Sequence, residues 1–458
     1  MSETKVASSA WCLILAAWIF ALEYSLYFVT SDFLDKVIKL GMTLVMLAYL
    51  QYRRSASLVN EKTVLFLFYV LLFTALIPSI FVGDPVTGIS QWMKIALMTV
   101  VLPLLLLNGR MVKKECEFLT RVYVATGIIF SIQAIVAFFG VLSNMIDTSA
   151  YAEIGRRPDL VETTLGLLGY ANAIKTPIEG FRWLRPQGWF LEPSLLGAFL
   201  LLPAFIEFGL FLDSRKVKHL FLFIVIFVAL FLTVSLAAYL GFIVGVSFLF
   251  LSKPLYRQLS RVFGTLSHAY PALIMGAFLG LAVLIITTLN SVADINVAEL
   301  EADQAILAGV YARDPNGDSG NLFREAATAD IYVSTILSNP FGTGFAATLG
   351  ENEFTSANGI LFWGVAGGFP ALIALIALFG YIFYAFCHPL LMSNLMLHRC
   401  IAASFIGHAV HNVSYGNWLA PYFLVHLFIV CVTARYSRQV RQVSLSGYDS
   451  ALVTTVPR

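Results

Sequence analysis

Long apolar runs separated by short polar segments dominate the chain. A helix of about 20 apolar residues crosses the hydrocarbon part of a bilayer and satisfies its own backbone hydrogen bonds while doing so. The pattern therefore predicts an all-α polytopic membrane protein that forms one membrane-embedded domain over residues 1–458. About twelve transmembrane helices are expected, at residues 9–28, 34–51, 63–82, 90–107, 118–141, 193–212, 217–234, 236–252, 270–289, 368–387, 397–416 and 417–435.

Two of these assignments depend on where an apolar run is divided. Residues 217–252 are too long for one span, and we place the break at Thr233-Val234-Ser235. The segment 356–366 is apolar but too short to cross a bilayer, so it is expected to be a re-entrant or interfacial helix.

Charged residues are scarce and unevenly distributed. The chain has 12% charged and 59% hydrophobic residues, whereas a soluble protein has about 25% charged residues. Basic pairs such as Arg53-Arg54 and Lys113-Lys114 fall on alternate connections, which predicts that these connections and both termini are cytoplasmic. The formal net charge of +2 gives no reason to expect a nucleic-acid partner.

Two connections, residues 142–192 and 290–355, are much longer than the others, and both are predicted on the outer face of the membrane. Long connections without a span of their own usually carry function. Short helices are expected in these loops, with amphipathic segments at residues 297–312 and 321–338 in the second loop.

The first long loop ends in the most informative stretch of the sequence, residues 180–194. Arg182 and Arg185 precede Glu192, and Pro193 suits the first turn of a helix. Arginine grips phosphate with a planar fork and stays charged, which favours an anion-binding site at the membrane surface. The alternative is an interfacial anchor in which an arginine pairs with Glu192.

The second long loop contains Arg324 and then Pro340-Phe341-Gly342-Thr343-Gly344, followed by the short apolar segment and Gly367-Gly368. In this order, with the Arg185-x-x-Gly188 and Glu192-Pro193-Ser194 run at the end of the first loop, these motifs resemble the bacterial O-antigen polymerase (Wzy-type) and O-antigen ligase (WaaL-type) superfamily. Ligases of that superfamily carry His-Asn where this chain has Ser356-Ala357-Asn358, which favours a polymerase.

The resemblance implies a membrane glycosyltransferase of the bacterial inner membrane. Such an enzyme polymerises undecaprenyl-pyrophosphate-linked repeat units into O-antigen or exopolysaccharide on the periplasmic face. It also implies that Arg185 and Arg324 bind the pyrophosphate of the donor. The lipid-linked glycan and membrane lipids are the expected partners, and a chain-length regulator and a flippase are candidate partners. An O-antigen ligase and a secondary transporter remain as alternatives.

The expected reaction is inverting and uses neither a metal nor a cofactor, because arginines can meet the charge of a pyrophosphate leaving group. Glu192 or His411 would orient or deprotonate the acceptor hydroxyl. His408 lies three residues from His411 on the same helix face, and the alternative for both is hydrogen bonding between helices. Lys94 is a further candidate for binding a lipid phosphate. Residues 314–325 have the spacing of a calcium loop, but Ser319 stands where that loop needs glycine.

Overall fold

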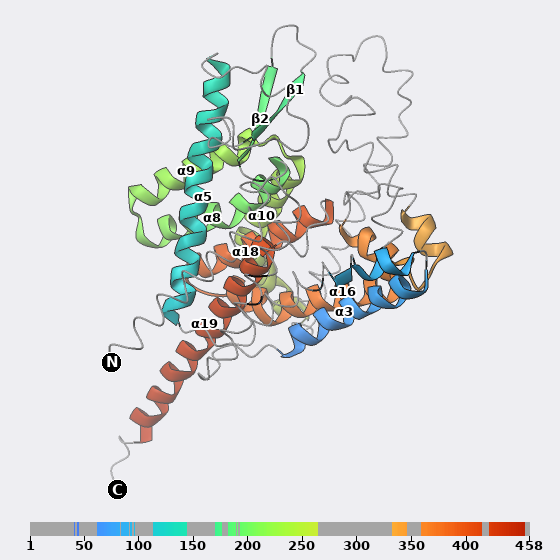
Figure 1. Cartoon of the computed structure of the whole chain (residues 1–458). Helices are drawn as coiled ribbons and strands as arrows, with labels where there is room; N and C mark the ends of the chain where they lie inside the picture. The colour runs from blue at the N-terminus through green and yellow to red at the C-terminus, as the bar shows by residue number, and fades with distance from the viewer. Residues whose placement is uncertain are drawn as a thin grey trace.

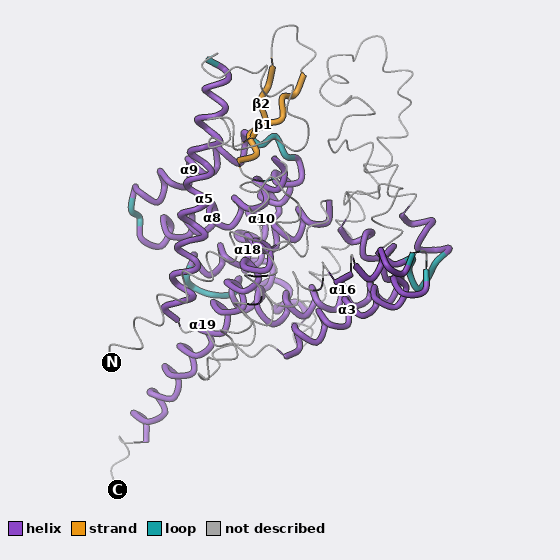
Figure 2. The backbone as a smooth tube through the Cα atoms, viewed as in Figure 1, coloured by secondary structure: helices purple, strands orange, loops and turns teal. Residues whose placement is uncertain are grey.

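The computed structural model of the chain describes residues 41, 44, 62–82, 84–90, 92, 93, 96, 113–143, 170–175, 182–188, 190, 193–263, 332–345, 359–414 and 421–453. These residues are almost entirely helical, with one pair of strands (Figures 1 and 2). The elements are α3 (Lys62–Phe81), α5 (Lys113–Leu142), β1 (Tyr170–Lys175), β2 (Arg182–Gly188), α8 (Pro193–Ser214), α9 (Val217–Leu232), α10 (Leu236–Phe263), α16 (Gly359–Ile382), the π-helical turn η2 (Phe383–Cys387), α17 (His388–Leu391), α18 (Met396–Ser414) and α19 (Pro421–Val453).

Within the described residues, five helices are long and apolar enough to cross a membrane: Lys62–Phe81, Glu117–Gly140, Pro193–Ser214, Ala237–Gln258 and Gly359–Leu391. Large apolar side chains such as Phe66, Ile129 and Phe221 remain exposed on the outside of these and neighbouring helices. Exposure of this kind is unfavourable in water and is accommodated by lipid. The chain therefore has the character of a membrane protein.

Most of the predicted spans that fall on described residues coincide with helices. The spans at 63–82, 118–141 and 193–212 coincide with α3, α5 and α8. Those at 217–234, 236–252 and 368–387 coincide with α9, α10 and the second part of α16. The last two predicted spans correspond to α18 and α19, which like the shorter α9 are not among the five helices long and apolar enough to cross a membrane. The spans at 9–28, 34–51, 90–107 and 270–289 lie wholly or largely outside the described residues. The expected total of about twelve therefore remains a prediction.

The predicted break between α9 and α10 is confirmed. Thr233 ends α9, and Val234 has a left-handed φ of 46° that no helix continues. Ser235 then caps α10, because its Oγ accepts a hydrogen bond from the backbone N–H of Ala238 at 3.3 Å. A serine at this position satisfies one of the backbone donors that every helix start leaves open.

Helix α8 is the central helix of the described bundle, and most of its side chains are buried against α5, α9, α10 and α18. Helices α10 and α18 cross close by, at Gly241 and Gly407. A Cβ atom on Gly241 would lie 2.5 Å from the carbonyl oxygen of Gly407, so only glycine lets the two backbones approach this closely.

The short apolar segment predicted at 356–366 is a separate helical piece at the start of α16. Gly368, with φ 67° and ψ −159°, breaks the helix directly after it. The piece is largely buried, and its later residues lie against α3.

Helices α3 and α16 lie side by side in Figure 1. The Pro-x-Gly-x-Gly motif forms a loop that contacts both of them. Thr343 donates from its N–H and from its hydroxyl to the carbonyl of Val365, at 2.8 and 3.1 Å. The N–H of Phe345 donates to Ser79 Oγ on α3 at 3.0 Å. The motif therefore has a structural role in holding α16 to α3.

The expectation of short helices in the first long loop is not met by residues 170–175 and 182–188, and the greater part of that loop lies outside the described residues. Its described residues form an antiparallel pair of strands, β1 and β2, beside one end of α5 (Figures 1 and 2). In the second loop, residues 332–338 are helical, in agreement with the end of the segment predicted at 321–338.

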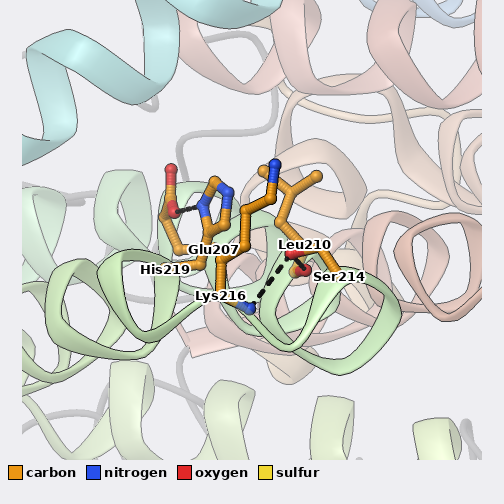
Figure 3. A network of polar contacts seen from close by, with 5 residues as sticks. All are labelled: Glu207, Leu210, Ser214, Lys216 and His219. Carbon is orange, nitrogen blue, oxygen red and sulfur yellow. Dashed lines mark hydrogen bonds and ion pairs between the residues drawn. The ribbon is translucent and has the colours of Figure 1, made fainter.

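A tight turn at the other end of α8 leads into α9 and is shown in Figure 3. Arg215 adopts a left-handed φ of 57°, and the N–H of Lys216 donates to Ser214 Oγ at 3.4 Å. The imidazole Nδ1 of His219 lies 2.6 Å from Glu207 Oε2, so the carboxylate buried in α8 has a partner from α9.

Candidate functional site

The strand pair is attached to the end of the helix bundle by an aromatic cluster. Phe190, just after β2, is buried between Phe130 of α5, Phe199 of α8 and Tyr422 of α19, with ring centroids 5.3–5.9 Å from its own. Such offset and edge-to-face contacts bury a large apolar area and fix the direction of the chain. β2 is therefore held directly over the start of α8.

The register of the strand pair places three basic residues in it. Arg182 pairs with Lys175, and Arg185 pairs with Asn172. Because successive residues of a strand alternate between its faces, residues 182 and 185 occupy positions on opposite faces of β2.

The first turn of α8 is fixed by hydrogen bonds from two other helices. Ser194 is buried, and its Oγ lies 2.9 Å from Ser235 Oγ and 3.0 Å from His411 Nε2. Ser235 comes from the α9–α10 connection and His411 from α18. Pro193 precedes Ser194 as the first residue of the helix, where its missing N–H leaves no intrahelical bond unmade.

His411 is fully buried and links this turn to the next residue of its own helix. Its Nδ1 lies 3.4 Å from Asn412 Oδ1. An Nδ1–H that donates to the amide oxygen leaves Nε2 as the acceptor for the hydroxyl of Ser194. The His411 imidazole therefore contacts the first turn of α8 through the hydroxyl of Ser194.

A second buried network of hydrogen bonds joins α18 to α19. Ser404 Oγ donates to the carbonyl of Ile401 at 2.8 Å, so it accepts from His426 Nε2–H at 2.9 Å. The Nδ1 of His426 is then an acceptor, and His408 Nδ1–H donates to it at 3.0 Å. His408 is consequently the Nδ1–H tautomer, and its ring stacks on Tyr422 with a centroid separation of 5.4 Å and an interplanar angle of 7°.

The two hydrogen-bonded networks meet on α18, and two buried polar atoms beside them have no hydrogen-bond partner among the described residues. The rings of His408 and His411 are 6.3 Å apart between centroids. Among the described residues, His408 Nε2 and Asn412 Nδ2 have no hydrogen-bond partner, and both are buried. One is an acceptor and the other a donor, four residues apart on the same helix face.

The predicted site residues divide into those the structure describes and those it does not. The backbones of Arg182 and Arg185 lie in β2, and His411 lies in α18 beneath Ser194. The structure therefore brings the arginine-bearing strand and His411 to the same turn of α8. The remaining three, Glu192, Arg324 and Lys94, lie outside the described residues.

Sequence reasoning missed His426, Ser404 and Ser235 as members of this site. The hydrogen bonding between helices that the spacing of His408 and His411 allows is confirmed. The signal for His426 was the same kind of residue in the next run. Its partner could not be identified without the packing of α18 on α19.

Within the described part of the chain, no three His, Cys, Asp or Glu side chains converge as metal ligands. Of the three buried histidines, His411 lies within hydrogen-bond distance of Ser194, and His426 lies within that distance of Ser404 and of His408. The calcium-like spacing at residues 314–325 lies outside the described residues.

Comparison with protein families, with curated proteins and with solved structures finds no match to this chain.

Proposed function

We propose that the chain is a membrane glycosyltransferase that polymerises undecaprenyl-pyrophosphate-linked oligosaccharide repeat units into O-antigen or exopolysaccharide. In this reaction a hydroxyl of the acceptor sugar attacks the anomeric carbon of the donor. The bond from that carbon to the pyrophosphate oxygen breaks, and the hydroxyl proton passes to a base. Two arginines can meet the charge that develops on the leaving group.

The observation that carries the proposal is the packing of β2 on the first turn of α8. It puts the strand with Arg182 and Arg185 next to the helix start that follows Glu192 in the sequence. A helix start has a positive electrostatic potential, which adds to that of the arginines and favours a bound anion. We assign Arg182, Arg185 and Arg324 to the pyrophosphate, and Lys94 to a lipid phosphate.

Glu192 is our candidate for the base. His411 is fully buried, and its contact with Ser194 supports a positioning role in which it holds the first turn of α8 in place. A hydrogen-bonded support of this kind is how many sites keep their reactive groups within a fraction of an ångström of the working geometry.

The proposal is tested with purified protein in liposomes that contain lipid-linked repeat units. Arg185→Ala should lower the rate of polymer formation about a hundredfold or more, as expected when a group that stabilises charge in the transition state is removed. Arg185→Lys should recover only part of the rate, because a lysine offers one ammonium in place of a planar fork. Full-length polymer made by Arg185→Ala at the normal rate would remove the assigned role.

The matched control is Lys218→Ala, which deletes an exposed positive charge at the far end of α8 and α9 and should leave the rate unchanged. In cells, deleting the gene separates the two enzyme classes. Loss of a polymerase leaves single repeats on the lipid A–core, whereas loss of a ligase leaves none. Counterflow of a labelled solute in the same liposomes, without glycan product, would indicate a transporter.

A further inference from the structure

A cleft of about 560 Å³ lies between α5, α8, α18 and α19. It is at the end of α8 that leads into the turn of Figure 3, away from Ser194 and the strand pair. Its volume falls in the range of about 300–1,000 Å³ that small-molecule sites occupy. None of the residues assigned above to glycan transfer lines it, so it is a separate feature of the molecule.

The walls of the cleft are apolar. They are built from aliphatic and aromatic side chains of all four helices, among them Val124, Ile128, Ile206, Leu210, Ile401 and Phe428. Two of these helices, α5 and α8, are also apolar enough to cross a membrane. A surface of this kind binds hydrocarbon, because filling it with an apolar chain removes apolar area from contact with water.

The rim of the cleft carries charge. Arg121 contributes from α5 and Arg435 from α19, so that a guanidinium group stands on each of two helices that border the opening. Glu117 lies one helical turn before Arg121. An arginine has five N–H donors, so it can bind a phosphate while it keeps a contact with a carboxylate.

The buried acid in the wall already has a partner. Glu207 lines the cleft, and its Oε2 lies 2.6 Å from His219 Nδ1 (Figure 3). Glu117 is the second carboxylate among the residues that line the cleft. The combination of an apolar wall with two arginines at its edge matches an amphiphile that has an anionic phosphate next to hydrocarbon.

We infer that the cleft binds a phospholipid, with its phosphate at Arg121 and Arg435 and an acyl chain along the apolar wall. The planar forks of two arginines suit a phosphate better than they suit a peptide segment, and the apolar wall needs no hydrogen-bonding partner. The inference does not rest on the proposed glycosyltransferase activity.

The test uses the full chain, purified in mild detergent and stripped of lipid. Native mass spectrometry then measures how much phosphatidylethanolamine or phosphatidylglycerol rebinds as each is added. Arg121→Gln and Arg435→Gln should each weaken rebinding about tenfold, because each removes a charged hydrogen-bonding partner of the phosphate. Unchanged rebinding in both variants would overturn the inference.

Two further variants make the result specific. Arg257→Gln removes an exposed positive charge on α10 at the same end of the bundle, outside the cleft, and should rebind lipid as the unchanged protein does. Ala125 is exposed and lines the cleft, so Ala125→Trp should fill it with little effect on folding and abolish rebinding. Normal rebinding by Ala125→Trp, or rebinding only of the undecaprenyl carrier, would contradict a phospholipid site.

Discussion

At the scale of single residues, the distinctive feature of this protein is a polar interior within apolar helices. Ser194, Ser235 and His411 form one hydrogen-bonded chain, and Ser404, His426 and His408 form another. Burying a polar group is costly unless it is hydrogen-bonded, so these chains stabilise one arrangement of α8, α18 and α19 over others.

Ser194→Ala should lower the free energy of unfolding by about 1–3 kcal/mol, because it leaves buried groups of His411 and Ser235 without their shared partner. The control is Ser247→Ala on α10, whose hydroxyl bonds only to the carbonyl of Ile243 in the same helix. That variant should stay within about 0.5 kcal/mol of the unchanged protein. Unfolding titrations of the detergent-solubilised protein provide the comparison, and equal effects of the two variants would contradict the network.

His408 and His426 should be energetically coupled. Either His408→Phe or His426→Phe leaves the other imidazole with an unmade bond inside the protein, whereas the double variant removes both groups. The loss in the double variant should therefore be smaller than the sum of the single losses by about 0.5–3 kcal/mol. Strict additivity in a double-mutant cycle would show that the contact between the two rings contributes nothing.

Tyr332 provides a prediction about pH outside the membrane spans. Burial raises the pKa of its phenol from 10.0 to about 12. The phenol is thus neutral in the folded protein at pH values where it ionises in the unfolded chain. Its contribution to stability is complete below pH 10 and is lost as the pH rises toward 12. Tyr332→Phe should reduce this alkaline loss, measured as the melting temperature of both proteins against pH.

At the scale of elements, the sequence was most informative where the signal is local. The break at Thr233-Val234-Ser235 and the short apolar segment at 356–366 were predictable, because length and small polar residues mark them. The strand pair was not. Residues 170–175 are short and have no strict alternation, and Pro186 interrupts β2. These segments are strands because they pair with each other, and the local sequence pattern of either segment does not contain that information.

The close crossing of α10 and α18 should tolerate no side chain. Gly407→Ala would push a methyl group against the backbone carbonyl of Gly241, and overpacking of this kind costs about 1–3 kcal/mol or more. Gly41→Ala is the matched control, because a Cβ there meets nothing within 4 Å. The melting temperature should fall for the first variant and stay level or rise for the second.

At the scale of the whole molecule, helix positions follow from the sequence, but the groups that meet between helices do not. The length of each apolar run predicts where α3, α5 and α8 lie in the sequence, because a helix satisfies the hydrogen bonds of its backbone with its own residues. The contact of Ser194 with His411 joins residues 217 positions apart. Such a contact depends on the order in which helices pack, which composition and periodicity leave undetermined.

The length of α8 predicts that its two ends lie on opposite sides of the membrane, and the basic pair Arg215-Lys216 predicts that the α8–α9 turn is cytoplasmic. Helix α8 has 22 residues, which at about 1.5 Å each is about 33 Å, enough to cross a hydrocarbon core of about 30 Å. Asn172→Cys in β1 should react with a membrane-impermeant maleimide added outside intact cells. Lys216→Cys at the α8–α9 turn should react only after the membrane is opened. Labelling of both from the same side would contradict this orientation.

The glycine contact between α10 and α18 also has a consequence for motion. Where the backbones of α10 and α18 are in contact, neither helix can rotate or slide without a steric clash. We therefore expect these two helices to move together as a rigid unit. The contact between α5 and α19 is looser, since a cleft lined largely by apolar side chains lies between these helices, α8 and α18. If the molecule changes conformation during its activity, we expect the movement at α5 and α19. A molecule bound in the cleft would then limit how far these two helices separate.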